Sequence, residues 1–253
     1  MYEEFASVYD EFMTEVPYAQ WADTIEAIWK KDGKMPELVC DLACGTGSLT
    51  AELAKRGYDM IGIDQSADML FEAQTKTAEA SDKPILFLQQ SMQEFELYGT
   101  VDSIVCTCDS INYLTDIEDL TETFRLVNNY LNPGGLFIFD VNTEHKFRDV
   151  IGSRTQSEVF EDAAYIWDNT YDEQSRINTY AVTFFAQHGE DYRRFDELHE
   201  ERAYSTEEIK DALAKAGLHF VAAYDDYSEH PMNDRSERVV YIAREFGKET
   251  CEV

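Results

Sequence analysis

The sequence predicts an α/β fold in which helices cover both faces of a doubly wound, mostly parallel β-sheet. From about residue 36, short apolar runs alternate with amphipathic stretches, an alternation typical of a parallel sheet. Between about residues 145 and 204 this alternation gives way to a stretch rich in Tyr, Phe, Thr and Val. The predicted fold is therefore a seven-stranded sheet with an antiparallel β insert.

Seven short apolar runs are the predicted strands of the main sheet. They cover residues 37–42, 58–63, 84–88, 101–107, 136–141, 218–223 and 237–243, and the last two are expected to be an antiparallel pair. Four segments with apolar residues at helical spacing are the predicted helices: 47–56, 66–80, 117–131 and 205–216. Ser66 is a candidate N-cap, Ser205 and Glu208 form a capping-box pattern, and Gly217 takes the last C-cap position.

The interrupting stretch predicts an antiparallel meander of three strands. Residues 159–167, 176–186 and 191–204 are rich in β-forming side chains, and turn-like segments at 169–175 and 187–190 separate them. Ahead of the sheet, Trp21, Ile25 and Ile28 have helical spacing and predict a helical flap. We expect three parts: a flap and core (1–144), an antiparallel insert (145–204) and a completing helix with two strands (205–253).

The composition fits a globular protein. Of the 253 residues, 44% are apolar, with 15 Phe and 15 Tyr, so the chain can bury a substantial core. The longest apolar runs are far shorter than the roughly 18 to 20 residues of a membrane span. The first residues carry neither a basic flank nor a hydrophobic stretch. We therefore expect no secretory signal, no membrane partner and a cytoplasmic location.

The charge balance argues against polyanionic partners. Lys and Arg number 21 against 51 Asp and Glu, a formal net charge of −30. The basic pairs at 30–31 and 193–194 stand isolated among acids. Because such a surface repels phosphate backbones, nucleic acid is not an expected partner.

The five cysteines form neither a metal-binding nor a disulfide pattern. They are Cys40, Cys44, Cys106, Cys108 and Cys251, without Cys-x-x-Cys spacing or paired histidines. Cys106 and Cys108 are expected on one face of a strand, because alternate side chains of a strand share a face. We expect no metal ion, and we expect four of the thiols to be small buried groups.

A glycine loop after the first strand is the most informative motif. The strand ends near Asp41, and Gly45 and Gly47 then open a helix, in the pattern Asp41-x-x-x-Gly45-x-Gly47. Glycines let a backbone pass close to a ligand, and the helix N-terminus offers free N–H donors. The next strand ends at Gly62-Ile63-Asp64, where an acid can accept both hydroxyls of a ribose. Together these motifs predict a nucleoside-cofactor site at the carboxyl edge of a parallel sheet.

The details of the loop favour one kind of cofactor. A dinucleotide loop requires Gly-x-Gly-x-x-Gly, but Thr50 stands at the third glycine position. Asp41 also suits a cationic amino acid better than a pyrophosphate. With these features the chain resembles class I S-adenosylmethionine-dependent methyltransferases, which implies their Rossmann-like fold and S-adenosylmethionine as cofactor.

Further motifs carry this resemblance over residues 36–142. In order along the chain they are Ser91-Met92, Asp102-Ser103-Ile104-Val105 with 108–113, and Leu131-Asn132-Pro133-Gly134-Gly135. The starting pattern, Phe5-Ala6-x-x-Tyr9-Asp10 with Val16-Pro17-Tyr18-x-x-Trp21, is similar to bacterial YqeM-like small-molecule methyltransferases. The segment His199-x-x-Arg202-x-Tyr204-Ser205 is similar to one in amino-sugar N-methyltransferases.

The resemblance implies a role for each matching residue. Asp41 and the backbone at Ala43, Gly45 and Gly47 would hold the methionine part of the cofactor. Asp64 would bind the ribose, with Gln65 and Met69 beside the adenosine. The adenine would lie beside Ser91 and Met92, with Asp109 near the methionyl amine and sulfonium, and Tyr9 and Trp21 closing over the site. Aromatic rings beside a sulfonium are physically reasonable, because ring faces attract cations.

The expected reaction is methyl transfer to N or O of a small molecule, with the insert as substrate lid. An amine acceptor must be neutral and a hydroxyl needs a proton acceptor, for which His145, His199 and Asp109 are candidates. No residue is assigned as the base. An NAD(P)-dependent oxidoreductase, an aminopropyltransferase and a non-catalytic cofactor-binding protein remain as alternatives. A free edge of the meander could pair two subunits in a homodimer.

Overall fold

The structure, a computed structural model, describes residues 9–10, 13–78, 83–189 and 191–248. Its main sheet has seven strands in the order β10-β11-β5-β4-β1-β2-β3. The strands are β1 Leu38–Leu42, β2 Asp59–Asp64, β3 Leu86–Gln89, β4 Val101–Cys106, β5 Leu131–Asn142, β10 Leu218–Asp225 and β11 Arg238–Glu245. All adjacent pairs are parallel except those that β11 makes with β5 and β10. The predicted mostly parallel, seven-stranded sheet is confirmed.

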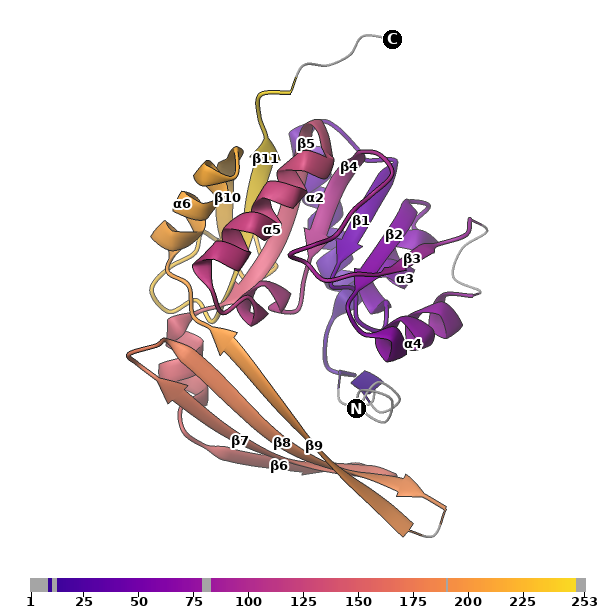
Figure 1. The fold of residues 1–253 in the computed structure, drawn as a ribbon, viewed down its shortest axis with the longest axis vertical. Coiled ribbons are helices and arrows are strands. Elements are labelled where there is room, and N and C mark those ends of the chain that lie inside the picture. The colour runs from indigo at the N-terminus through magenta and orange to yellow at the C-terminus, as the bar shows by residue number, and fades with distance from the viewer. Residues whose placement is uncertain (1–8, 11–12, 79–82, 190, 249–253) are drawn as a thin grey trace.

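Helices pack on both faces of this sheet, as Figure 1 shows. They are α2 Tyr18–Asp32, α3 Ser48–Lys55, α4 Ala67–Thr77, α5 Ile117–Tyr130 and α6 Thr206–Lys215, with a short 3₁₀ helix, η1, at Ser110–Tyr113. One apolar core joins α2 and α3 to the sheet, and a second joins α5 and α6 to the opposite face. In the described ranges, each helix is too short or too polar to span a membrane.

The predicted helix starts are confirmed by their caps. The Ser66 hydroxyl accepts a hydrogen bond from the Met69 amide at the start of α4. At the start of α6, Ser205 and Glu208 form a reciprocal capping box. The C-cap of α6 is Ala216, and Gly217 follows it in a left-handed conformation with φ of 82°. The predicted C-cap at Gly217 is therefore off by one residue.

The insert is a separate antiparallel sheet of four strands, in the order β6-β7-β8-β9. The strands are β6 Thr155–Val159, β7 Ala163–Asp172, β8 Ile177–His188 and β9 Asp191–Arg202, and a π-helical turn, η2 Lys146–Ile151, precedes them. The prediction of three strands is wrong because a further strand, β6, precedes the predicted strand 159–167, and a tight turn at the start of that range separates β6 from β7. At this turn the Phe160 amide donates to the Ala163 carbonyl, 2.7 Å away, and no glycine or proline marks it. Figure 1 shows the four strands as a long twisted ribbon beyond the end of the main sheet.

Two other local predictions are wrong. Strand β5 begins at Leu131, not at residue 136, because Leu131 already pairs with Val101 across a register irregularity. Strand β4 ends at Cys106, and Cys108 has a left-handed backbone with φ of 56°. The thiols of Cys106 and Cys108 therefore do not share the face of one strand. Cys251 and the Phe5-Ala6 part of the starting pattern lie outside the described residues.

Candidate active site

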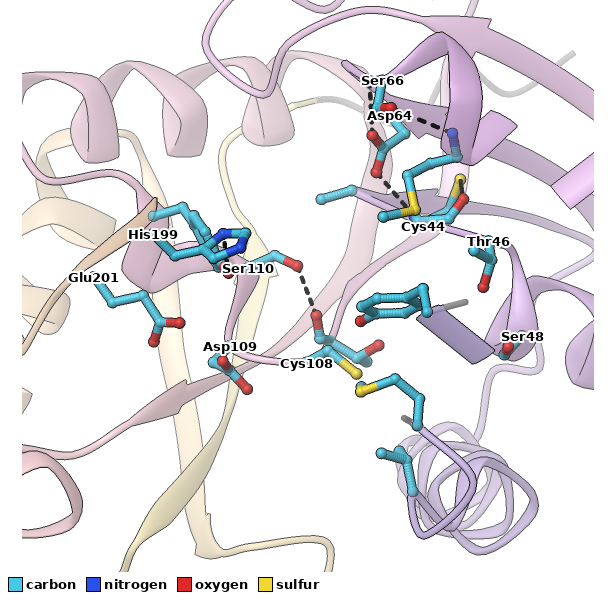
Figure 2. A pocket seen from close by; sticks show the side chains of 18 of the residues that line it. Cys44, Thr46, Ser48, Asp64, Ser66, Cys108, Asp109, Ser110, His199 and Glu201 are labelled. Atoms are coloured by element: carbon cyan, nitrogen blue, oxygen red, sulfur yellow. Dashed lines mark hydrogen bonds between the residues drawn. The ribbon is translucent and has the colours of Figure 1, made fainter. Parts of the chain in front are cut away.

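A cavity of about 580 Å³ lies between the carboxyl edge of the main sheet and the inner face of the four-stranded sheet. The ends of β1, β2 and β4 supply one side of it, and β7, β8 and β9 supply the other. In Figure 2, Asp64 and the loop after β1 lie on one side of the pocket, and Asp109, His199 and Glu201 lie on the other. The cavity thus has a side that matches the predicted cofactor motifs and a side formed by the insert.

The loop after β1 is held open by backbone hydrogen bonds. The Cys44 amide donates to the Ile63 carbonyl of β2, and the Gly47 amide donates to the Cys44 carbonyl, both at 2.9 Å. Gly45 has φ of 54°, and a Cβ placed on it would meet nothing within 4 Å. A ligand can therefore reach the Gly45 backbone directly, as a cofactor cradle requires.

Asp41 lies at the bottom of the cavity beneath this loop. Its side chain is buried, and the Thr50 hydroxyl donates to Oδ2 at 2.5 Å. Burial raises the pKa of the Asp41 carboxyl to about 7, against the opposing effect of the Thr50 hydrogen bond. Thr50, the residue that breaks the dinucleotide pattern, is therefore a direct partner of the acid.

Asp64 is the last residue of β2 and faces the same cavity. Its Oδ2 accepts the Gly45 amide at 2.8 Å, and its Oδ1 accepts the Ser66 amide at 2.9 Å. Burial raises the pKa of Asp64, while these backbone donors lower it. A carboxylate accepts about four hydrogen bonds, so both oxygens can still accept hydroxyl donors of a ribose.

Asp109 is held at the cavity wall by a buried ionic network. The Arg238 guanidinium contacts Asp109 Oδ1 at 2.7 Å and Asp140 Oδ1 at 2.5 Å. Asp140 also accepts the amides of Cys108 and Asp109 and the Tyr227 hydroxyl. These contacts fix a turn in which Cys108 and Asp109 both have positive φ. Burial raises the pKa of Asp140, and Arg238 opposes that rise.

The inner face of the four-stranded sheet supplies the other wall. Tyr180 of β8 pairs directly with His199 of β9, so their side chains share a face, and Glu201 follows two residues later on that face. The His199 ring nitrogen Nδ1 lies 3.3 Å from the Tyr113 hydroxyl, and burial lowers the pKa of His199. Trp167 packs edge-on against Tyr180, with ring centroids 4.8 Å apart.

Most of the predicted site residues line this one cavity. They are Tyr9, Trp21, Asp41, Ala43, Gly45, Asp64, Gln65, Met69, Met92, Asp109 and His199. The Trp21 ring stacks on Tyr227 at 4.3 Å, and the Arg238 guanidinium lies over it. Whether these residues contact the cofactor stays a prediction.

Gly47, Ser91 and His145 lie outside the cavity lining. Gly47 is the N-cap of α3, and a Cβ on it would come within 3.0 Å of the Ala73 Cβ, so its place in the motif also reflects close packing of α3 on α4. His145 Nδ1 lies 2.9 Å from Asp149 Oδ2, away from the cavity. As a base for the reaction it is therefore poorly placed.

Sequence reasoning missed the residues that complete the far wall and the ionic network. They are Arg238, Asp140, Tyr227, Glu201, Trp167 and Tyr180. One signal was available for Asp140, because an acid inside the apolar run 136–141 requires a buried partner. The other residues meet through pairing of distant segments.

Comparison with known proteins agrees with this geometry. Residues 39–135 match a family described as a methyltransferase domain. YqeM of Bacillus subtilis (strain 168), which carries a methyltransferase name, is 39% identical over 245 residues, a match that covers 96% of this chain and 97% of that protein. A protein of Geobacillus sp. (strain WCH70), also named as a methyltransferase, is 34% identical over 250 residues, covering 96% and 99%.

Solved structures extend the likeness to the whole fold. The crystal structure of a S-adenosylmethionine-dependent methyltransferase from Clostridium acetobutylicum ATCC 824 has a TM-score of 0.88 and 34% identity, covering 97% of this chain and 99% of that one. DesVI of Streptomyces venezuelae has a TM-score of 0.79 at 22% identity, covering 94% and 97%, and shares the fold. The chain belongs to the S-adenosylmethionine-dependent methyltransferases. Within that class it is a relative of YqeM, and its cofactor is S-adenosylmethionine.

Proposed function

We propose that the protein transfers a methyl group from S-adenosylmethionine to a nitrogen or oxygen atom of a small molecule held against the four-stranded sheet. The observation that carries this proposal is the two-sided cavity. Motif residues from β1 and β2 line one side, and polar groups of the insert, among them His199 and Glu201, line the other.

S-adenosylmethionine, when bound, supplies a methyl group that passes to the acceptor atom while the C–S bonding electrons stay on sulfur. The chain's contribution is to align the acceptor with that methyl carbon and to exclude water. The Arg238–Asp140 pair contributes by fixing the turn that presents Asp109. The wall of Tyr180, Trp167 and His199 would hold the acceptor.

Features of the chain and of its relatives support a small acceptor over a polyanion. The net charge of −30 opposes binding of nucleic acid. A relative from Streptomyces venezuelae, 29% identical over 143 residues and covering 55% of this chain and 58% of that protein, is named as an N,N-dimethyltransferase of a dTDP-linked amino sugar. Such relatives favour methyl transfer over hydride transfer, aminopropyl transfer or simple cofactor storage. We also propose that the protein is cytoplasmic and forms a homodimer.

The test of this function is release of S-adenosylhomocysteine from S-adenosylmethionine in the presence of separate acceptor panels. We expect turnover with a panel of small amines or small alcohols, and none with tRNA. Turnover with tRNA alone would contradict the proposal, as would the absence of turnover with every small-molecule panel.

The cofactor side is tested by calorimetric titration of wild type and of Asp64→Ala. We expect wild type to bind S-adenosylmethionine and S-adenosylhomocysteine but not NAD. The variant should bind about a hundredfold more weakly, because two hydrogen bonds to a charged group are lost. Asp59→Ala, at the other end of β2, is the matched control and should bind normally. Unchanged affinity in Asp64→Ala would show that this acid does not hold the ribose.

A further inference from the structure

We infer that the side of the cavity formed by the insert is a subsite for an ammonium group, held between the Glu201 carboxylate and aromatic rings of the four-stranded sheet. This inference rests on the proposed function and narrows its acceptor to molecules that bear a basic amine. Its ligands would be the protonated amine, which must lose its proton before it can accept the methyl group, and the methylated ammonium product.

The first argument is the placement of Glu201. The residue is 1% exposed and lies next to the last residue of β9, yet its side chain lines the cavity. The position of this strand end is fixed by Asn112, whose side-chain amide donates to the carbonyls of Asn142 and Arg202 at 3.0 and 2.9 Å. Figure 2 shows the Glu201 side chain next to Asp109 on the pocket wall. The backbone around Glu201 is therefore fixed, and its carboxyl group has a defined position in the cavity wall.

The second argument is that Glu201 lacks a cation of its own. Across the described ranges, no Lys, Arg or His forms an ion pair with it; its one polar contact is the Asn142 side-chain amide, 3.5 Å from Oε2. The nearby Arg238 is shared by Asp109 and Asp140, and the Lys146 ammonium donates to Asn142 Oδ1 at 2.8 Å. A buried carboxylate without a cationic partner is costly.

The charge state of Glu201 fits this description. Burial first, and Asp109 second, raise the pKa of Glu201 well above its usual range, and Lys146 and Arg238 only partly oppose the rise. A bound cation would favour the ionised form and supply the missing partner. Glu201 and Asp109 therefore oppose an anionic ligand, and a cation is the ligand that would favour the ionised form of both acids.

The third argument is the aromatic lining. Tyr180 and Trp167 pack edge-to-face on the inner side of the sheet, and Tyr113 lies edge-on to His199 with centroids 5.8 Å apart. Tyr180 lies directly opposite His199 and diagonally opposite Glu201 on one face of the β8–β9 pair, and it lines the same cavity as Asp109 and Glu201. Ring faces bind alkylammonium ions better than they bind neutral amines, because their quadrupole attracts positive charge. Carboxylate and rings together match an alkylated ammonium.

The test uses choline as the cationic probe and 3,3-dimethyl-1-butanol, its neutral carbon isostere, as the comparison. Both are titrated into protein saturated with S-adenosylhomocysteine, with heat and tryptophan fluorescence as readouts. We expect choline to bind wild type about tenfold more tightly than the isostere does. Glu201→Gln should lose that preference, whereas Glu200→Gln, the exposed neighbour on the other face of β9, should retain it.

Three outcomes would overturn the inference: no choline binding to wild type, equal binding of both probes, or an unchanged preference in Glu201→Gln. Titration with S-adenosylhomocysteine separates these from failure of the proposed function. If wild type does not bind S-adenosylhomocysteine, the proposed function fails. If wild type and Glu201→Gln both bind it while choline shows no preference, the ammonium subsite alone is wrong.

Discussion

Asp41 and Asp64 lie near the carboxyl ends of the neighbouring strands β1 and β2, but their surroundings differ. Asp41 pairs with Gly62 in the sheet, two residues before Asp64, and is almost completely buried. Its partner is a side-chain hydroxyl, whereas Asp64 is held by two backbone amides. Burial therefore dominates at Asp41, and its protonation changes near neutral pH.

This difference predicts how stability depends on pH. The pKa of Asp41 is about 7 in the folded protein and 3.8 in its ordinary state, so the folded state holds the proton more tightly. The stabilisation from the protonated form is complete below about pH 4 and is lost as the pH rises to about 7. We expect the urea midpoint to fall over this range in wild type and to fall less in Asp41→Asn.

The matched control for this measurement is Asp211→Asn, an exposed acid on α6, which should keep the wild-type pH dependence. Asp64, Asp140 and Glu201 also have raised pKa values, so part of the slope should remain in Asp41→Asn. An identical slope in wild type and Asp41→Asn would contradict the role of Asp41.

Asp41 and Asp64 could be predicted from the sequence, but the ionic network of Arg238 and the placement of Glu201 across the cavity could not. Each acid follows an apolar run at the carboxyl end of a parallel strand, and such ends meet at one edge. Arg238 reaches Asp140 only because β11 inserts beside β5, 98 residues along the chain. In the sequence, Glu201 cannot be distinguished from the exposed acids around it. Only the pairing register of β8 and β9 shows that its side chain lies on the inner face of the four-stranded sheet.

At the scale of elements, the close approach of β2 and β3 explains the glycine of the Gly62-x-Asp64 motif. Gly62 pairs with Phe87, and a Cβ on Gly62 would lie 2.6 Å from the Phe87 ring and 3.0 Å from the Cys44 sulfur. The glycine is thus required by packing two residues before Asp64. It need not touch the cofactor.

Gly62→Ala should therefore destabilise the protein by about 1–3 kcal/mol, the usual cost of overpacking. The measurement is the urea midpoint, and Phe87→Leu in the same chain should restore part of the loss by removing the ring. Gly99→Ala is the control, because a Cβ there meets nothing within 4 Å and φ is ordinary. Equal stability of Gly62→Ala and wild type would refute the steric explanation.

The elements of the main sheet and its helices were predictable because each has a strong local period, and α4 and α6 also begin at side-chain caps. The insert was less predictable because the turn between its first two strands lacks a marker residue. Residues 160–163 turn with a bulky aromatic and two acids, so the break between β6 and β7 carries no glycine or proline. Which residues of the insert line the cavity depends on how its strands pair, and this pairing leaves no local pattern in the sequence.

At the scale of the whole molecule, charge opposes folding. A net charge of −30 within 253 residues gives the compact state substantial self-repulsion, which dissolved salt screens. We expect the urea midpoint to rise when sodium chloride increases from about 20 to about 300 mM. Potassium chloride should act alike, because the effect is ionic screening. A midpoint that falls with either salt would contradict this expectation.

The late position of β11 in the sequence determines when the ionic network around Asp109 can form during synthesis. Strand β10 lies at the sheet edge and joins the sheet through β11, whose first residue is Arg238. On the ribosome, the glycine loop, both acids and the insert are all synthesised before this strand. A growing chain can thus assemble its glycine loop early, yet the turn that carries Asp109 gains its counterion only once Arg238, 129 residues further along the chain, has been added.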